Sequence, residues 1–264
     1  MTVRKGETMQ AHDQMVGLYS FPKSGNTWLR AIIAGLFDLP MGPQMLGRYV
    51  PDTAMQAIGR HPVRVGDQAW CFYKSHHKHP LTEHDGVPVR TDRFLFIHRH
   101  PLDVFVSYLN YMSGNVQNIG ARILGFDFAR VEDLTPAQWD LAFAMFLEWG
   151  TFSLGPPTDH PFGGVFDGFA NFSRMQRGGQ AVHLLRYEDL ITDFDATVTG
   201  IGGFLGLATV DPARVRAISE ALTTADGRFF WKRRAGTYRQ YLSEDRIAAF
   251  EARWASELRM MGYP

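Results

Sequence analysis

The sequence predicts one α/β domain over residues 1–264, with a central parallel sheet flanked by helices. Apolar runs typical of strands alternate with segments in which apolar residues recur at i, i+3 and i+4, the spacing of amphipathic helices. A chain of 264 residues, 45% of them hydrophobic, is also long enough for one large buried core. Such sheets bind ligands beyond the carboxyl ends of their strands, so functional residues are expected just after each strand.

The elements of this domain can be assigned in chain order. Strands are expected over 15–21, 68–75, 93–98 and 181–186. Helices are expected after the first and third of these strands, over 194–205, from Pro212 with Asp211 as its cap, and from Ser243 onward. The last helix has an apolar stripe made of Ile247, Phe250, Trp254, Leu258 and Met261. A helix between successive strands returns the chain to the same end of the sheet, which predicts parallel pairing.

Composition argues against several classes of protein. The 27 basic and 27 acidic residues create no general field that would attract nucleic acid or an anionic membrane. Cys71 is the only cysteine, so no disulfide can form within the chain. No segment approaches the roughly 20 apolar residues of a membrane span, and the first residues do not resemble a signal peptide. The sequence therefore predicts a cytoplasmic protein with no nucleic-acid or membrane partner.

The stretch YSFPKSGNTW, residues 19–28, ends the first strand and opens a helix. The unpaired amides of a helix start, together with Lys23, Ser24 and Thr27, suit a phosphate or sulfate. The loop nearly matches the nucleoside-triphosphate pattern G-x-x-x-x-G-K-[ST], but Pro22 replaces the second glycine and has no N–H to donate. A nucleotide kinase or triphosphatase of P-loop type is one alternative, and an ordinary helix start with an exposed lysine is another.

The second strand ends in YKSHHKHP, where Lys74 and His76 are two residues apart and project to the same side of an extended chain. A neutral histidine can take a proton from a hydroxyl group, and a neighbouring lysine can stabilise developing negative charge. The pair therefore predicts a base beside a cation. Alternatively, the histidines of this run could form a metal cluster or lie in a solvated loop. They are His76, His77, His79 and His84.

The third and fourth strand ends also carry polar residues. Arg99 ends the third strand, Asp103 suits the positive end of the following helix, and Ser107 lies further along that helix. Arginine is the side chain best shaped for bidentate phosphate binding, although an isolated arginine is more often part of a structural ion pair. Tyr187 follows the fourth strand and could contact a base or ribose, while Glu188 beside it is expected to cap a helix.

Four segments together resemble the sulfotransferases that use 3'-phosphoadenosine 5'-phosphosulfate (PAPS). YSFPKSGNTWLR is similar to the 5'-phosphosulfate loop Y-P-K-[SA]-G-[TN]-T-W, which makes it a P-loop-like phosphosulfate loop. FIHRHPLDVFVSYLNYM is similar to the 3'-phosphate motif R-N-P-x-D-x-x-V-S-x-Y, with His100 replacing asparagine. YKSHH resembles the segment with the catalytic base, and LLRYEDL the fourth strand end. The segments follow the family's order and cover most of the chain.

The resemblance implies a set of donor-binding residues. The 5'-phosphate would be held by Lys23, Ser24, Gly25, Asn26 and Thr27. Trp28 would stack near the adenine, Tyr187 would touch the adenosine, and Arg99 with Ser107 would bind the 3'-phosphate. The last family motif, R-K-G-x-x-G-x-W, is the weakest match: it keeps Gly236, offers Phe229 for the adenine, and leaves open which basic residue binds the 3'-phosphate among Lys232, Arg233 and Arg234.

The same resemblance implies a mechanism that needs no metal. His76 would remove the proton of the acceptor, Lys23 would stabilise the leaving oxygen, and Lys74 would stabilise the transferring group. Ser107 would hold Lys23 until the acceptor binds. PAPS would be converted to 3',5'-adenosine bisphosphate (PAP). A catalytically inactive nucleotide-binding protein is the alternative from another class, although Lys23 and His76 are both present.

The acceptor is expected to be a small apolar or aromatic molecule with a hydroxyl group, before an amine. Residues 113–180 are rich in aromatic side chains, and residues 160–175 resemble the flexible family segment that closes over the acceptor. Core packing alone is the other explanation for these rings, because several fall at helical spacing. A homodimer is left open as a partner.

Overall fold

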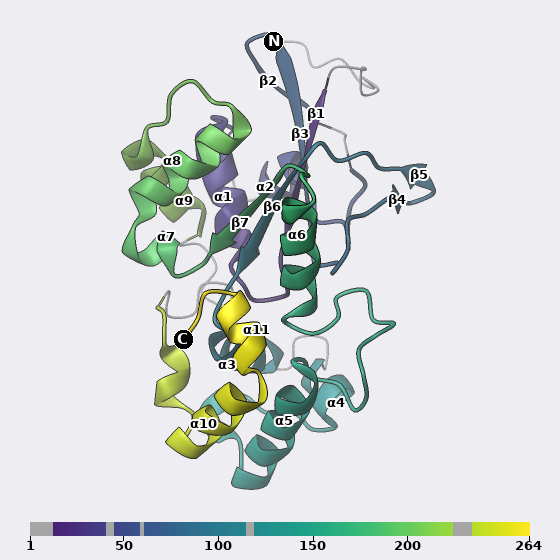
Figure 1. Cartoon of the computed structure of the whole chain (residues 1–264), viewed down its shortest axis with the longest axis vertical. Helices are drawn as coiled ribbons and strands as arrows, with labels where there is room; N and C mark the ends of the chain where they lie inside the picture. The colour runs from purple at the N-terminus through teal and green to yellow at the C-terminus, as the bar shows by residue number, and fades with distance from the viewer. Residues whose placement is uncertain (1–12, 41–44, 59–60, 115–118, 224–233) are drawn as a thin grey trace.

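The fold is built on a five-stranded sheet in the order β2-β3-β1-β6-β7. The computed structural model describes residues 13–40, 45–58, 61–114, 119–223 and 234–264. The strands of the sheet are β1 (Gln14–Tyr19), β2 (Val63–Val65), β3 (Gln68–Ser75), β6 (Arg93–His98) and β7 (Val182–Arg186). All neighbours except β2 pair in parallel, so the carboxyl ends of β1, β3, β6 and β7 lie at one end of the sheet (Figure 1). The predicted α/β class and central parallel sheet are confirmed.

The edge strand β2 is the exception to the predicted parallel pairing. It runs antiparallel to β3, with Val63 opposite Trp70 and Val65 opposite Gln68. Gly66 adopts a φ of 60° in the short turn between the two strands. A strand of three residues with mostly exposed side chains has no buried run that could reveal it in the sequence.

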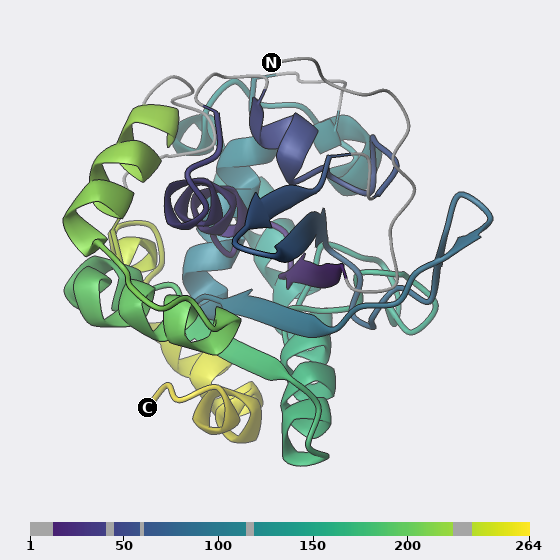
Figure 2. The same cartoon turned by 90° about the horizontal axis from the view of Figure 1, so that it is seen from above.

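Three helices cover one face of the sheet (Figure 2). They are α1 (Asn26–Leu36), α8 (Phe194–Leu205) and α9 (Pro212–Thr223). A Cβ at Gly35 of α1 would lie 3.1 Å from Val215 of α9, so the glycine allows these two helices to pack closely. Asp211 accepts a hydrogen bond from the Arg214 amide at 3.0 Å, as expected for the cap of α9.

The opposite face is covered by α6 (Asp167–Arg177), and further helices lie beyond the carboxyl ends of the strands (Figure 1). The latter are α3 (Pro101–Met112), α4 (Ile119–Leu124), α5 (Pro136–Trp149), α10 (Glu244–Arg253) and α11 (Ala255–Met260). Phe172 of α6 stacks on Phe96 of β6 at 4.8 Å between ring centroids. The ring centroids of Phe105 in α3 and Phe146 in α5 lie 5.1 Å apart, so aromatic packing connects these two helices.

The predicted last helix is two helices, α10 and α11. Ser243 caps α10 by accepting from the Arg246 amide, but Trp254 interrupts the helical path with φ −119° and ψ 25°. The Trp254 indole N–H donates to the Leu147 carbonyl at 2.8 Å, which fixes the interruption against α5. The predicted apolar stripe still faces inward, because Ile247, Phe250 and Leu258 are buried.

Short elements complete the fold. They are α2 (Met45–Tyr49), the hairpin of β4 (Glu83–His84) and β5 (Val87–Pro88), α7 (Asp189–Thr192) and the 3-10 helices η1 (Val131–Asp133) and η2 (Thr237–Gln240). Within the described ranges, no helix has both the length and the apolar character needed to cross a bilayer.

Candidate active site

The turn between β1 and α1 has an unusual backbone. Lys23 and Gly25 both have positive φ, at 69° and 104°. A Cβ on Gly25 would lie 2.5 Å from the Tyr187 ring, so only glycine combines this conformation with this contact. Helix α1 starts at Asn26, and no side chain caps it. The turn therefore presents the main-chain amides of a helix start, which can bind an anion.

The side chains of this turn differ in how deeply they are buried. Ser24 and Asn26 are buried, and the Asn26 amide group donates to the Leu18 carbonyl at 3.2 Å and to the Ser20 hydroxyl at 3.1 Å. Asn26 Nδ2 thus ties the loop to β1, and its main-chain N–H lies at the helix start. Thr27 is partly exposed at the first turn of α1. The structure therefore supports an anion site formed mainly by the backbone.

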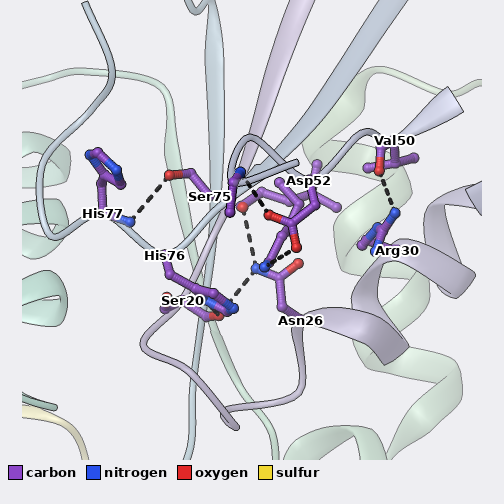
Figure 3. Close-up of polar contacts among 11 residues, drawn as sticks. Ser20, Asn26, Arg30, Val50, Asp52, Ser75, His76 and His77 are labelled. Carbon is purple, nitrogen blue, oxygen red and sulfur yellow. Dashed lines mark hydrogen bonds and ion pairs between the residues drawn. The ribbon is translucent and has the colours of Figure 1, made fainter. Parts of the chain in front are cut away.

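His76 follows β3 and turns its ring toward the same loop (Figure 3). Its Nδ1 lies 2.9 Å from the Ser20 carbonyl oxygen and 3.3 Å from the Ser20 hydroxyl. Because a carbonyl only accepts, Nδ1 carries the proton and Nε2 of the neutral ring keeps its lone pair. Burial, with the positive charge of Lys74, lowers the pKa of His76 to about 3. The ring is thus a neutral base at physiological pH.

Lys74, two residues earlier on β3, is buried and paired. Its Nζ donates to Asp52 Oδ2 at 2.6 Å. The predicted cation beside His76 is therefore part of an ion pair, and its charge acts on His76. Sequence reasoning missed Asp52, because no spacing pattern links it to a residue 22 positions later.

Lys23 projects from the β1–α1 turn toward α3. Its Nζ lies 4.6 Å from the centroid of the Tyr111 ring. Ser107 lies one turn before Tyr111 on the same face of α3, so the two residues proposed to act together come from adjacent elements. The contact of Ser107 with Lys23 stays a prediction.

Arg99 follows β6 and is buried at the amino end of α3. Its guanidinium donates to the Arg234 carbonyl at 3.0 Å and lies 3.8 Å from Asp103. It also lies over the Tyr187 ring, 4.4 Å from the centroid. Nε of Arg99 is buried and has no hydrogen-bond partner among the described residues. A buried donor without a partner is uncommon, and an anionic ligand would satisfy it.

Asp103 connects this arginine to a distant part of the chain. Its carboxylate accepts from the Gly236 amide at 2.8 Å and from the Tyr238 amide at 3.0 Å. The sequence predicts that Asp103 complements the positive end of α3. Its hydrogen bonds to the amides of residues 236 and 238 were not predicted. The contacts bring Gly236 and the backbone of Arg234 next to Arg99. The predicted residues Phe229, Lys232 and Arg233 lie outside the described residues.

Trp28 and Glu188 both contact other side chains near β7. Trp28 is buried, with its ring 5.6 Å from Tyr187 and 6.0 Å from Phe194, and its indole N–H has no partner among the described residues. Glu188 is the N-cap residue of α7, but its side chain makes no capping hydrogen bond within the described residues: it accepts from the His100 amide at 2.9 Å and from the Tyr263 hydroxyl at 2.8 Å. These bonds fasten the C-terminal residues to the start of α3.

His100, which replaces the asparagine of the resembled motif, works as a helix cap. Its Nδ1 accepts from the Leu102 amide at 3.3 Å. Burial lowers the pKa of His100 to about 4, with Arg239 and Arg99 acting in the same direction. The ring is therefore neutral and available as an acceptor, as an asparagine side chain would be.

The aromatic residues of 113–180 lie mostly in the core. Phe146, Phe166, Phe169 and Phe172 are buried and belong to one hydrophobic cluster. Phe162 differs, because it is partly exposed and lies 5.9 Å from the His76 ring and 6.0 Å from the His77 ring. Core packing accounts for the first group, and the lid interpretation now depends on Phe162 and its neighbours. In the described ranges no three histidine, cysteine or acidic residues are placed to hold a metal ion.

In this α/β fold, the start of α1 and the buried Arg99 both lie against Tyr187. The sulfotransferase domain model matches residues 13–262, and the chain therefore belongs to the sulfotransferase domain family. It is a sulfotransferase.

Solved structures with the same fold are distant in sequence. Mouse sulfotransferase SULT7A1, complexed with PAP, is 18% identical with a TM-score of 0.60, over 94% of this chain and 86% of that protein. Retinol dehydratase in a complex with retinol and PAP is 17% identical with a TM-score of 0.58, over 95% and 83%. A putative steroid sulphotransferase of Arabidopsis thaliana is 16% identical with a TM-score of 0.55, over 97% and 80%. No curated protein matched the chain.

Proposed function

We propose that this sulfotransferase moves the sulfuryl group of PAPS to a hydroxyl group of a small acceptor, with His76 as the base. The observation that supports this proposal is the hydrogen bond from His76 Nδ1 to the Ser20 carbonyl at 2.9 Å. It leaves Nε2 as a proton acceptor next to the anion-binding turn. Similar folds have been solved with PAP, which adds support for the donor.

The described residues fit a donor with two separated anionic ends. The start of α1, with Lys23, suits the 5' end, and Nε of Arg99, which has no partner among the described residues, suits the 3'-phosphate. Tyr187 lies between them, against both Gly25 and Arg99. A nucleoside triphosphate has one continuous anionic chain and gives no reason for a second cationic site, so the P-loop kinase alternative is disfavoured.

Sulfuryl transfer requires the protein to align the attacking and leaving oxygens and to neutralise the charge that develops on them. PAPS supplies the sulfuryl group, and the acceptor oxygen forms the new S–O bond as the bond to the phosphate oxygen breaks. Nε2 of His76 takes the acceptor proton, Lys23 neutralises charge on the leaving phosphate oxygen, and Lys74 contacts the transferring group. Ser107 holds Lys23 before the acceptor binds. These cations make a metal ion unnecessary in this scheme.

The acceptor is proposed to be an apolar or aromatic molecule that carries the reacting hydroxyl, with an amine as the second choice. Phe162 supports this choice, because it brings an aromatic ring against the proposed base. Retinol dehydratase, a protein of similar fold, was solved with retinol and with androsterone, which are apolar alcohols. We further propose that residues 1–264 form one domain, that 113–180 contribute its acceptor side, and that the protein works in the cytoplasm without nucleic-acid or membrane partners. A homodimer remains part of the proposal.

The nucleotide specificity can be tested by thermal denaturation. PAP without metal should raise the melting temperature, and ATP with magnesium should not. Stabilisation by ATP with magnesium alone would instead support the kinase or triphosphatase. Incubation with labelled PAPS and a panel of phenols, alcohols and amines then separates an enzyme, which forms a sulfated product, from an inactive binding protein, which binds PAP and transfers nothing.

A further inference from the structure

Asp52 is an acidic residue placed directly against the proposed catalytic centre. It follows α2 and forms an isolated parallel bridge with Lys74 of β3. The Lys74 amide donates to the Pro51 carbonyl at 2.8 Å, and the Thr53 amide donates to the Lys74 carbonyl at 3.0 Å. The side chains pair at 2.6 Å, with exposed fractions of 9% for Lys74 and 24% for Asp52. Backbone and side chain together therefore hold the ion pair in one position.

The charges around this pair are mostly positive. Figure 3 shows Asp52 between the His76 ring and the Arg30 side chain, which comes from α1 and donates to the Val50 carbonyl. The ionisable groups that act on Lys74 or on the adjoining His76 are Arg30, Lys23 and Asp52. Asp52 is the one anion of this set within the described residues.

We infer that Asp52 is a positioning residue that keeps Lys74 protonated and fixed at the end of β3, beside His76. The inference rests on the proposed function, in which Lys74 contacts the sulfuryl group. An ammonium group has three N–H donors, and the described residues supply one acceptor, Asp52 Oδ2, to Lys74 Nζ. The remaining donors can bind the oxygens of the transferring group while Asp52 stays in place.

The electrostatics explain why a carboxylate is needed at this position. Burial lowers the pKa of Lys74 below its ordinary value, Asp52 opposes that effect, and Arg30 adds to it. Burial alone would raise the pKa of Asp52, but the Lys74 ammonium brings it below its ordinary value. Each partner therefore stabilises the charged form of the other. Without the carboxylate, Lys74 would be a buried cation near Arg30 and would lose its proton at a lower pH.

The inference can be tested without knowing the acceptor, because PAPS carries the sulfuryl group and PAP does not. Calorimetry would give the ratio of PAPS to PAP affinity from about pH 6.5 to about pH 9.5 for the wild type and for Asp52→Asn. The lower pH favours protonated Lys74 in both proteins, so the ratio in Asp52→Asn should there equal or exceed the wild-type ratio. At the higher pH it should be about tenfold lower than in the wild type, because Lys74 without the Asp52 carboxylate loses its proton at a lower pH.

Two further variants isolate the role of Lys74. Lys74→Met should lose the PAPS preference at every pH, and adding Asp52→Asn to Lys74→Met should cause no further pH-dependent loss. Asp195→Asn is the matched control, because it removes the carboxylate of the exposed Arg216–Asp195 pair and should leave the ratio unchanged. Thermal denaturation of each variant measures its folding separately.

Specific results would overturn the inference. Parallel pH profiles for the wild type and Asp52→Asn, or an equal loss at every pH, would mean that Asp52 does not hold the charge of Lys74. A full effect of Asp52→Asn in the Lys74→Met background would mean that Asp52 acts elsewhere. Failure of the wild type to bind either PAPS or PAP would instead contradict the proposed function itself.

Discussion

The two cationic regions of the site are built in different ways. The region around His76 is assembled from the ends of two adjacent parallel strands, β1 and β3, by short contacts such as His76 to Ser20. The region around Arg99 depends on a segment more than 130 positions away, which Asp103 holds through the Gly236 and Tyr238 amides. The region around His76 is thus formed by the strand ends of the sheet, whereas the region around Arg99 depends on contacts with residues 234–238, the docked segment.

This difference suggests a division of labour. The strand ends give the rigid placement that a proton transfer and an in-line displacement require. The segment around Gly236 and Tyr238 instead comes from a distant part of the chain and places the Arg234 carbonyl against Arg99. We therefore expect substitutions near His76 to affect the chemical step and substitutions near Arg99 to affect nucleotide affinity.

His76→Ala should have the largest effect. Loss of the general base should lower kcat by about a thousandfold, within the usual range for such groups, while PAP affinity changes little. Because the pKa of His76 is lowered to about 3 by burial, the base stays neutral as the pH falls, and kcat should show no loss from its protonation until well below neutrality. The measurement is a pH series with an acceptor found in the panel. His79→Ala, at an exposed position of the same segment, is the control, and near-normal turnover of His76→Ala would exclude the base assignment.

Arg99→Ala should have the next largest effect, on binding. Removing the buried guanidinium should weaken PAP by about a hundredfold, as expected for charge-assisted hydrogen bonds to a phosphate. Calorimetric titration with PAP measures this loss. Arg216→Ala removes an exposed arginine of α9 that is paired with Asp195 and should leave PAP affinity unchanged. Equal PAP affinity in Arg99→Ala and the wild type would exclude Arg99 as the 3'-phosphate ligand.

Gly25→Ala should destabilise the protein at the β1–α1 turn, where Gly25 packs against Tyr187. A Cβ would be strained by the φ of 104° and would clash with Tyr187. The free energy of unfolding should fall by about 3 kcal/mol, from backbone strain and overpacking together. Gly206→Ala is the matched control: its φ is 77°, but nothing lies within 4 Å of the new Cβ, so only the strain of about 1 kcal/mol applies. Equal losses in urea denaturation would show that the Tyr187 contact is unimportant.

Asp103→Asn should have the smallest of these effects. The asparagine keeps the volume but removes the negative charge that accepts from Gly236 and Tyr238. PAP affinity should fall by about tenfold, because the docked segment is held less firmly beside Arg99. Asp133→Asn, in an exposed pair with Arg130, should change nothing measurable. A loss of kcat at saturating PAPS, with unchanged affinity, would contradict the proposed division of labour.

Sequence patterns revealed the parts of the fold that depend on local order. The strands at 68–75 and 93–98 were predicted at their observed bounds, because each is an apolar run that ends at a turn or a helix start. The first strand was predicted to 21 but ends at Tyr19, because the backbone turns from Ser20 onward. The antiparallel β2 and the break at Trp254 depend on tertiary contacts and left no periodic signal.

In the site as well, contacts that depend on tertiary structure could not be predicted from sequence patterns. The placement of His76, Arg99 and the β1–α1 turn at one end of the sheet follows from the predicted parallel strands, whose carboxyl ends lie together. The contacts of Asp52 and Asp103 were not predicted, because these carboxylates bond to residues 22 or more positions away. Aromatic spacing could not separate core from acceptor site, since the buried Phe172 and the partly exposed Phe162 occur in the same segment.

A single-turnover assay with labelled PAPS and excess enzyme tests the division of labour most directly, because it separates the chemical step from binding. At saturating enzyme, Arg99→Ala should transfer sulfate within about tenfold of the wild-type rate, although it needs a higher concentration to saturate. His76→Ala should saturate at the wild-type concentration but transfer about a thousandfold more slowly. The reverse pattern, with fast transfer in His76→Ala and a slow chemical step in Arg99→Ala, would contradict the account.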